Sequence, residues 1–370
     1  MSNITLGASG PPRSGTHTSE HSSARTSGHN GARTSGHNGA HLTDDQLGFL
    51  VAAAGRAPSV HNTQPWRFAP LGASLELHAD RARRLRAVDP AGRELLISCG
   101  AALFGLRLAV RQLGHLPVVE LLPDPARPDL LARVQLGRQV TLGPGEWEMH
   151  AAAPHRHTHR GPFSAEPLPA GLLAALQHDA VAEGATLVLL DQQLRYRLRS
   201  LAAAAARWQR RDPLVRAELR RWTRQEGSTA RDGVPAYAYP AVPAAQDGIS
   251  AGPERALPLR DFDLGRGAGL LEVGGSPPAA TAVLVTTGDT PTDWLRAGQA
   301  LNRMLIHAAS KWVFATLNSQ PMESTALRAL VRSRLFLPGA PQILLELGRA
   351  HTAPATARRP VDELISTRTP

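Results

Sequence analysis

The sequence predicts an α+β fold, because helix-type and strand-type patterns both occur along it and its first two strands are joined by a tight turn. Thr43-Asp44-Asp45-Gln46 forms a capping box, which predicts a helix that ends near Ala54. Apolar and polar residues then alternate over 66–69 and 75–78, and the turn at 70–73 predicts a hairpin. The 370 residues, of which 42% are hydrophobic, can bury one large core or two smaller ones.

Further elements follow in chain order. Asp89 and Pro90 predict the start of a helix that runs to Gly114, since Asp is a favoured N-cap and Pro a favoured first residue. The centre of this helix carries small residues, which allow close packing of another helix. The remaining patterns predict strands near 118–122, 132–136, 185–190, 281–287 and 342–347, and helices near 169–183, 191–211, 213–224 and 291–310.

Composition bears on location and partners. The formal charge is +10, but Lys311 is the only lysine, aromatic content is 4%, and the arginines are spread along helices rather than clustered with stacking aromatics. This argues against nucleic acid as a partner. Cys99 is the only cysteine, which excludes an internal disulfide and fits a cytoplasmic protein. No apolar run approaches the ~20 residues of a membrane span, so we expect no membrane contact either.

Two stretches lack any pattern of regular structure. Residues 1–41 are of low complexity, because segment 24–31 recurs directly as 32–39, and we expect this tail to be disordered. Residues 225–278 are rich in Gly, Pro and Ala. So long an irregular insert in a compact domain is usually a lid or a disordered loop.

The loop 56–68 holds the densest group of chemically specific residues. Its two prolines push the residues before them out of the helical region, so we expect a loop of fixed shape. Inside it lie the hydroxyl of Ser59, the imidazole of His61 and the amides of Asn62 and Gln64. Amides both donate and accept, which suits a planar heteroaromatic ring better than a metal or a bare anion. The alternative is a plain connection from helix to strand, with Trp66 in the core.

A second motif occupies 154–163. If it is extended, Arg156, Thr158 and Arg160 share one face, and the three histidines at 155, 157 and 159 share the other. Two guanidinium groups and a hydroxyl at this spacing predict a phosphate clamp. The histidines offer a rival interpretation as a metal-binding face. No matching acidic or histidine cluster occurs elsewhere in the part expected to fold, which favours the clamp.

Both motifs resemble those of a known family. The run Ala57-Pro58-Ser59-Val60-His61-Asn62-Thr63-Gln64-Pro65-Trp66 resembles the flavin loop of FMN-dependent nitroreductases, and its form is most similar to the Acg branch. Arg156, Thr158 and Arg160 match the start of that family's flavin-phosphate motif. Segments 94–103 and 291–301 also resemble the family, so the likeness covers most of the chain from about His41 to Val361.

The order of the motifs has a structural implication. In ordinary nitroreductases the phosphate motif precedes the loop, and two subunits together build the site. Here the phosphate motif follows the loop by about a hundred residues. The resemblance therefore implies a fused pseudo-dimer with one flavin site, in which residues 42–150 form the first half-domain and residues 151–370, with a lid at 225–278, form the second. Such a chain is a pseudo-dimeric monomer or a loose homodimer.

The resemblance also implies which residues hold FMN. Leu317 and Asn318 correspond to the segment beside the redox-active edge of the flavin. Arg358 and Arg359 resemble a second phosphate-binding piece, for which the alternative is a solvated basic tail. Two residues depart from the family pattern, since Trp312 stands where a small Gly is expected and Glu346 where an arginine is expected. The full set is Pro58, Ser59, Val60, Asn62, Gln64, Arg156, His157, Thr158, Arg160, Leu317, Asn318, Arg358 and Arg359.

The implied function is that of a flavin oxidoreductase. FMN would carry the redox chemistry, with NAD(P)H as electron donor and a nitroaromatic or quinone-like small molecule as acceptor. No catalytic acid or base stands out in the sequence, and no metal site is predicted. The alternative is a stress or storage protein that sequesters FMN with little or no turnover, which a closed lid would favour.

Overall fold

The structure is a computed structural model that describes residues 41–239, 257–264, 266, 269, 276–350 and 355–366. The predicted low-complexity tail therefore lies outside the described residues except for His41, and the predicted lid at 225–278 lies partly outside them. Among the described residues, no helix is both long and apolar enough to cross a lipid bilayer.

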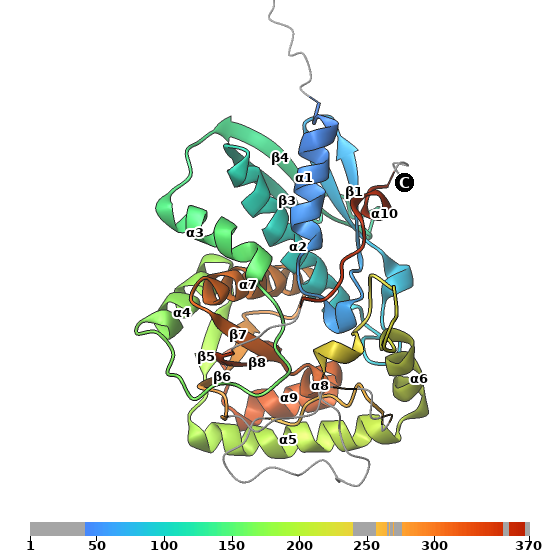
Figure 1. The fold of residues 1–370 in the computed structure, drawn as a ribbon, viewed down its shortest axis with the longest axis vertical. Coiled ribbons are helices and arrows are strands. Elements are labelled where there is room, and N and C mark those ends of the chain that lie inside the picture. The colour runs from blue at the N-terminus through green and yellow to red at the C-terminus, as the bar shows by residue number, and fades with distance from the viewer. Residues whose placement is uncertain are drawn as a thin grey trace, which may run out of the picture. The chain divides into compact units, whose positions relative to one another are not determined.

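The first sheet has four antiparallel strands in the order β1-β2-β4-β3 (Figure 1). These are β1 (Trp66–Leu71), β2 (Ser74–Ala79), β3 (His115–Leu121) and β4 (Leu130–Gln139). Helix α1 (Asp44–Gly55) precedes them and has the predicted capping box, in which Thr43 and Gln46 bond reciprocally. Helix α2 (Arg93–Gln112) connects β2 to β3, and both helices pack on one face of the sheet to form an apolar core.

The second sheet repeats this topology. Its strands β5 (Thr186–Leu189), β6 (Ala280–Thr286), β7 (Val313–Leu317) and β8 (Ala340–Arg349) are antiparallel in the order β5-β6-β8-β7. Helix α4 (Leu172–Ala182) precedes them, and α7 (Pro291–Ser310) connects the second strand to the third. The equivalent elements therefore occur in the same order around both sheets, a repeat that the residues themselves do not reveal.

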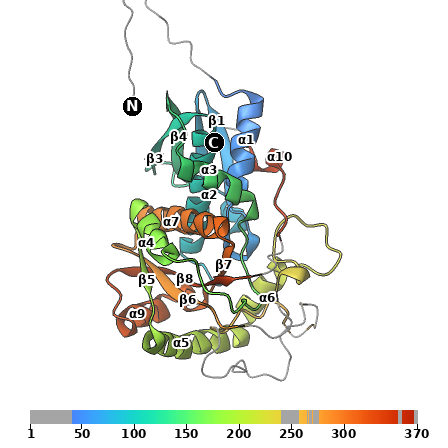
Figure 2. The ribbon, with the colours of Figure 1, turned by 60° about the vertical axis from the view of Figure 1, so that its left-hand side comes forward.

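The remaining elements cover or connect these two sheets. Helices α5 (Gln192–Arg211) and α9 (Thr325–Arg334) pack on the face of the second sheet opposite α4 and α7 (Figures 1 and 2). The C-terminal stretch crosses back to the first sheet, where Ser366 N donates to Phe68 O of β1. The other helices are α3 (Pro144–Ala152), α6 (Pro213–Trp222), α8 (Gln320–Glu323) and α10 (Val361–Leu364), with short 3-10 turns at Val60–Asn62, Arg81–Arg83, Ala153–His155 and Ala236–Ala238.

Helices α2 and α7 cross in close contact and join the two sheets. A Cβ atom on Gly298 would lie 1.9 Å from Ile97 O, and one on Gly100 would lie 2.2 Å from Leu295 O. Only glycine allows this approach. Asn302 Nδ2 of α7 donates to Ala101 O at 2.8 Å inside the contact, while its buried Oδ1 has no partner among the described residues.

The structure corrects one predicted boundary. Helix α2 begins at Arg93 and not at Asp89-Pro90, because Gly92 has φ 76° and interrupts the helical path. The Asp89 carboxylate still accepts from Leu95 N at 2.9 Å, so it caps the first turn from outside. Trp312 has φ 56° just after α7, a conformation that glycine adopts at low cost, and its side chain is 58% exposed outside the pocket described below.

Candidate functional site

A pocket lies beside the α2–α7 contact and is lined by residues from the first sheet's part of the chain, between 58 and 98, and from the second sheet's part, between 158 and 343. The space that protein atoms leave open amounts to about 940 Å³, open solvent at its mouth included. The lining combines apolar side chains with a few polar groups, as in small-molecule sites. Its residues are Pro58, Ser59, Val60, His61, Glu94, Ile97, Ser98, Thr158, Arg160, Leu259, Arg260, Phe262, Leu301, Thr316, Leu317, Asn318, Ser319, Gln320, Gln342 and Ile343.

The loop after α1 forms one wall of this pocket. Ser59 Oγ accepts from Gln64 N at 2.9 Å, and Val60 N donates to Ser98 Oγ of α2 at 3.2 Å. His61, Asn62 and Gln64 all have positive φ, between 47° and 55°, which is unfavourable for residues with side chains. A strained loop that is held by specific hydrogen bonds is a common feature of binding sites.

The two amides of this loop bind other parts of the protein. Asn62 Nδ2 donates to Gly233 O at 3.0 Å and to Ala357 O at 3.1 Å. Gln64 Nε2 donates to Arg231 O at 2.8 Å, and its Oε1 accepts from Arg359 N at 2.8 Å. Neither amide lines the pocket. They hold segments 231–233 and 355–360 against the loop, and their predicted contact with FMN stays a prediction.

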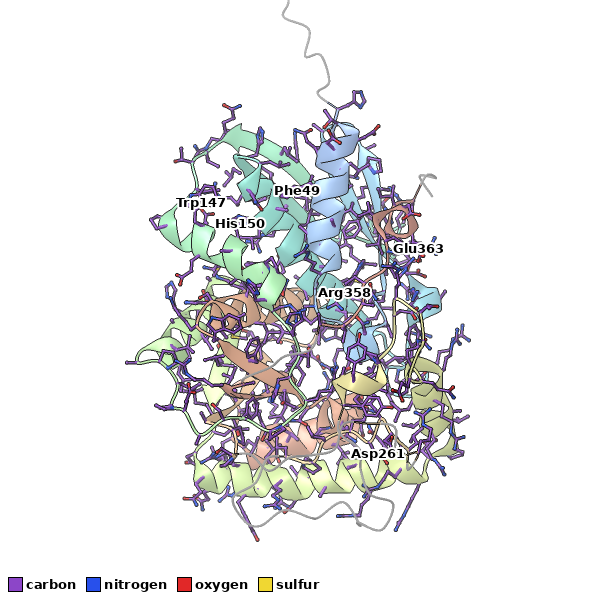
Figure 3. The ribbon with its side chains drawn as sticks, in the orientation of Figure 1. Phe49, Trp147, His150, Asp261, Arg358 and Glu363 are labelled. Carbon is purple, nitrogen blue, oxygen red and sulfur yellow. The ribbon has the colours of Figure 1, made fainter. Side chains whose placement is uncertain are left out.

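Three arginines gather next to the loop, and no carboxylate of a described residue pairs with them. Arg156 is 5% exposed, its Nη2 donates to Arg56 O at 3.0 Å, and its Nη1 has no partner among the residues that the structure describes. Arg358 lies by the C-terminal end of α1 (Figure 3) and donates to Asn62 Oδ1 at 3.1 Å. Arg160 lines the pocket and donates to Ala238 O at 3.4 Å. Within the described ranges none of the three forms an ion pair.

The electrostatics of these arginines favour an anion. Burial, together with the nearby charge of Arg358, lowers the pKa of Arg156 to about 9. Burial likewise lowers the pKa of Arg160 and of Arg358 to about 10, and Arg160 adds to the effect on Arg358. Buried cations without counter-ions are unfavourable, and bidentate guanidinium groups suit phosphate oxygens. The cluster therefore fits a phosphate group.

Thr158 connects this cluster to the second sheet. It pairs with Ala315 of β7, and His159 N donates to Ala315 O at 2.9 Å. The predicted extended conformation therefore occurs at this point of the motif. It directs Thr158 and Arg160 into the pocket, while the neighbouring His157 is half-buried outside it.

The three histidines of the motif have different surroundings. His155 packs against the Trp312 ring at 5.7 Å, and His159 Nε2 bonds to Pro162 O at 3.0 Å. Burial and the charge of Arg156 lower the pKa of His157 to about 4. In the part of the chain that the structure describes, no three His, Cys, Asp or Glu side chains converge as metal ligands would.

Leu317 and Asn318 lie in the pocket wall, as the resemblance implies for that segment. Asn318 Nδ2 donates to Glu346 Oε2 at 3.1 Å, and Leu257 N donates to Glu346 Oε1 at 2.9 Å. Burial raises the pKa of Glu346 to about 7. The residue that departs from the family pattern thus connects the pocket wall to segment 257–264.

Segment 257–264 covers one side of the pocket. Arg260 forms an ion pair with Glu323 and donates to Ser319 Oγ at 3.2 Å. The ring of Phe262 lies edge-on to His61 at 5.4 Å, and the guanidinium of Arg160 lies 5.5 Å from its centroid. Of the predicted lid, segment 257–264 is therefore bound beside the pocket, and the gating role of the lid stays a prediction.

Several lining residues were not among the predicted site residues. Both ring nitrogens of the buried His61 lack partners within the described part of the chain, and burial lowers its pKa well below the ordinary value. Its place in the loop was the only signal. The sequence did not mark Glu94 or Phe262 as site residues. Glu94 resembles any acidic residue in the first turn of a helix, and Phe262 lies in a stretch without a helix or strand pattern. Arg359, by contrast, pairs with Glu363 outside the pocket lining.

The fold and the site together define an α+β protein with two sheets of the same topology and a pocket that lies beside a cluster of arginines. No family model matches the chain. A protein of Mycobacterium tuberculosis H37Rv named "Putative NAD(P)H nitroreductase Rv3131" is 32% identical over 325 residues, which are 85% of this chain and 90% of that protein. Rv3127 of the same strain, named as an uncharacterized protein, is 32% identical over 86% of this chain and 92% of its own length.

This similarity shows that the chain belongs to the NAD(P)H nitroreductase family. The branch named acg matches too, because the M. tuberculosis protein "Putative NAD(P)H nitroreductase acg" is 28% identical over 88% of this chain and 97% of its own length. The resemblance inferred from the two motifs is therefore confirmed.

Solved structures give a weaker likeness. A nitroreductase with bound FMN from Desulfitobacterium hafniense has a TM-score of 0.36 at 13% identity, over 60% of this chain and 98% of that one. An NADPH:FMN oxidoreductase from Vibrio harveyi complexed with NAD+ has a TM-score of 0.33 at 12% identity, over 57% of this chain and 73% of that one. TM-scores this low support no conclusion about the site, and none is based on them.

Proposed function

We propose that this protein binds FMN and passes electrons from NAD(P)H to a quinone-like or nitroaromatic acceptor. The relatives' names motivate the reaction class. The observation that carries the proposal is the group of Arg156, Arg160 and Arg358, which has no carboxylate partner among the described residues. Three positive charges beside a largely apolar pocket suit a ligand that joins a phosphate to a planar ring.

Each part of the site has a role in this proposal. The three guanidinium groups and the Thr158 hydroxyl hold the phosphate of FMN. Ser59 and Val60 on one side, and Leu317 and Asn318 on the other, flank the ring. Arg156 and Arg358 are not themselves part of the pocket lining, and neither are the further predicted FMN ligands Asn62, Gln64, His157 and Arg359. The chemistry that FMN supplies when bound is hydride transfer, and the protein positions the ring and excludes water.

One observation favours a second function, the retention of FMN with little turnover. Segment 257–264 is bound over the pocket at three places, through Leu257 to Glu346, through Arg260 to Glu323, and through Phe262 to His61. A donor and an acceptor reach a covered ring only in proportion to the open fraction of the protein. A rarely open segment would make the protein a flavin store.

The two functions differ in their response to NAD(P)H. The purified protein is reconstituted with FMN, and its absorption spectrum is recorded. It is then mixed without oxygen with NADH or NADPH, and afterwards with a quinone or a nitroaromatic compound. A reductase loses the flavin bands with the donor and regains them with the acceptor. Bands that persist for hours in the presence of either donor would leave only flavin retention, and failure to take up FMN would refute both functions.

A further inference from the structure

Glu94 places a carboxyl group in the pocket wall, on the first turn of α2. The residue is 7% exposed, and its Oε1 accepts from Arg93 Nη2 at 2.8 Å. No described residue donates a hydrogen bond to Oε2. A carboxylate normally accepts several hydrogen bonds when it is buried, so a single donor is an unusual environment for the charged form.

The charges around Glu94 do not balance if every group is ionised. The titratable groups that act on Glu94 are Arg93 on the same helix, Asp89 before it, Glu323 on α8 and Arg260 on the covering segment. Together with Glu94 itself, these are three carboxyl groups and two guanidinium groups. Within this set one negative charge would therefore remain uncompensated, which is unfavourable in a buried region unless a proton neutralises it.

The hydrogen bonds decide which carboxyl group takes the proton. Glu323 accepts from Arg260, from Gln209 and from Ser319 Oγ, so its charged form is well stabilised. Burial raises the pKa of Asp89 too, but its carboxylate accepts from the backbone of Leu95 at 2.9 Å and from that of Glu94, and both bonds oppose the rise. Glu94 has only Arg93, whose guanidinium is shared with backbone carbonyls of other segments.

That sharing weakens the Arg93 interaction with Glu94. Arg93 Nη1 donates to Gln342 O at 2.7 Å, and its Nη2 donates to Met322 O at 3.2 Å as well as to Glu94. The raised pKa of Glu94 is consistent with the small number of hydrogen-bond donors to its carboxylate. Burial is the main cause that raises it to about 8; Arg93 and Arg260 oppose the rise, and the charges of Glu323 and Asp89 add to it.

We infer that Glu94 holds the proton of this cluster at neutral pH and gives it to the acceptor that is reduced in the pocket. This inference rests on the proposed function. Reduction of a quinone to a hydroquinone consumes one hydride and one proton. A bound flavin would supply the hydride. At Glu94 the O–H bond breaks while a new O–H bond forms on the acceptor oxygen, and a proton from the bulk solvent then restores the carboxyl group, so the reaction balances.

The first test needs no flavin. Infrared spectra of the flavin-free protein are recorded across pH 6 to 10 in a Glu346→Gln background, because Glu346 has a raised pKa of its own. We expect the carbonyl band of a protonated carboxyl group at pH 7 that disappears with a midpoint near 8 and is missing after Glu94→Gln. The matched control is Glu183→Gln, since Glu183 is also 7% exposed but pairs with Arg107 and Arg303. The control should keep the band. A Glu94 that is already ionised at pH 7 would overturn the inference.

The second test separates proton donation from a structural role. Glu94→Gln keeps the size of the side chain and its ability to donate a hydrogen bond, but it cannot release a proton. We expect reoxidation by a quinone to slow by about 10²-fold or more relative to bleaching by NAD(P)H in the same variant, and to lose its dependence on pH near 8. An unchanged pH profile of reoxidation would refute the proton transfer. If the wild type itself takes up no FMN, the proposed function fails and the transfer with it, while the infrared band still locates the proton.

Discussion

Replacement of Arg156 by Met should stabilise the flavin-free protein and weaken FMN binding. Met keeps most of the length of the side chain but removes the charge. Burial lowers the pKa of Arg156 from its ordinary value of 12.5 to about 9. At about 1.36 kcal/mol per pH unit, this corresponds to a penalty on the order of 5 kcal/mol for the buried charge.

Only part of that penalty returns as stability, because the guanidinium also loses its bond to Arg56 O. Replacing buried charges by apolar residues of similar size typically stabilises a protein by about 1–4 kcal/mol or is neutral. The opposite effect is expected for the ligand. A hydrogen bond to a charged group contributes about 1.5–3 kcal/mol, so the Kd for FMN should rise about 10- to 150-fold.

Urea unfolding of the flavin-free protein and quenching of flavin fluorescence measure the two quantities. Arg107→Met is the control, because Arg107 pairs with Glu183 far from the motif residues and is not part of the pocket. It should lower stability and leave the Kd unchanged. An Arg156→Met protein that is clearly less stable and binds FMN as the wild type does would show that Arg156 is structural, and the clamp assignment would be wrong.

Three further predictions concern packing, pH and access. Gly298→Ala should destabilise the protein by about 3 kcal/mol or more in urea unfolding, because a Cβ atom there would lie 1.9 Å from Ile97 O. The control is Gly48→Ala, where a Cβ atom would have nothing within 4 Å. It should be neutral or stabilise the protein by up to about 1 kcal/mol. Equal effects would contradict the described α2–α7 contact. The stability of the flavin-free protein should fall as the pH drops from 6.5 towards 4, because His157 binds a proton in the unfolded chain but not in the folded protein. His157→Gln should therefore reduce the dependence of the melting temperature on pH in this range. An identical slope in the variant would refute this. Phe262→Ala should speed both FMN loss on dialysis and bleaching by NADPH, since Phe262 covers His61 and Arg160; if neither rate changes, the segment does not control access.

Local patterns predicted much of the fold. The capping box at Thr43, the first hairpin and helix α7 depend on residues close together in sequence, and the structure has all of them. The start of α2 was predicted too early because Asp89-Pro90 is a common helix start, whereas the positive φ of Gly92 decides the boundary. The repeated topology of the two sheets was implied only by the order of the family motifs.

Site residues that belong to a local motif could be predicted from the sequence, whereas contacts between segments far apart in the sequence could not. Thr158 and Arg160 were found from their spacing, and the structure places both in the pocket. The partners of Asn62 lie 171 and 295 residues away in sequence, so its role in holding those segments could not be foreseen. Glu94 is similar, since its environment depends on Glu323 and Arg260, which no local pattern connects to α2.

The most direct test of the central claim is to compare FMN with riboflavin, which lacks the phosphate, as ligands of the flavin-free protein. If Arg156, Arg160 and Arg358 hold the phosphate, at least two charge-assisted hydrogen bonds distinguish the ligands, and FMN should bind about 100-fold more tightly or better. The difference should shrink in Arg156→Met. Equal affinities for FMN and riboflavin would contradict the account.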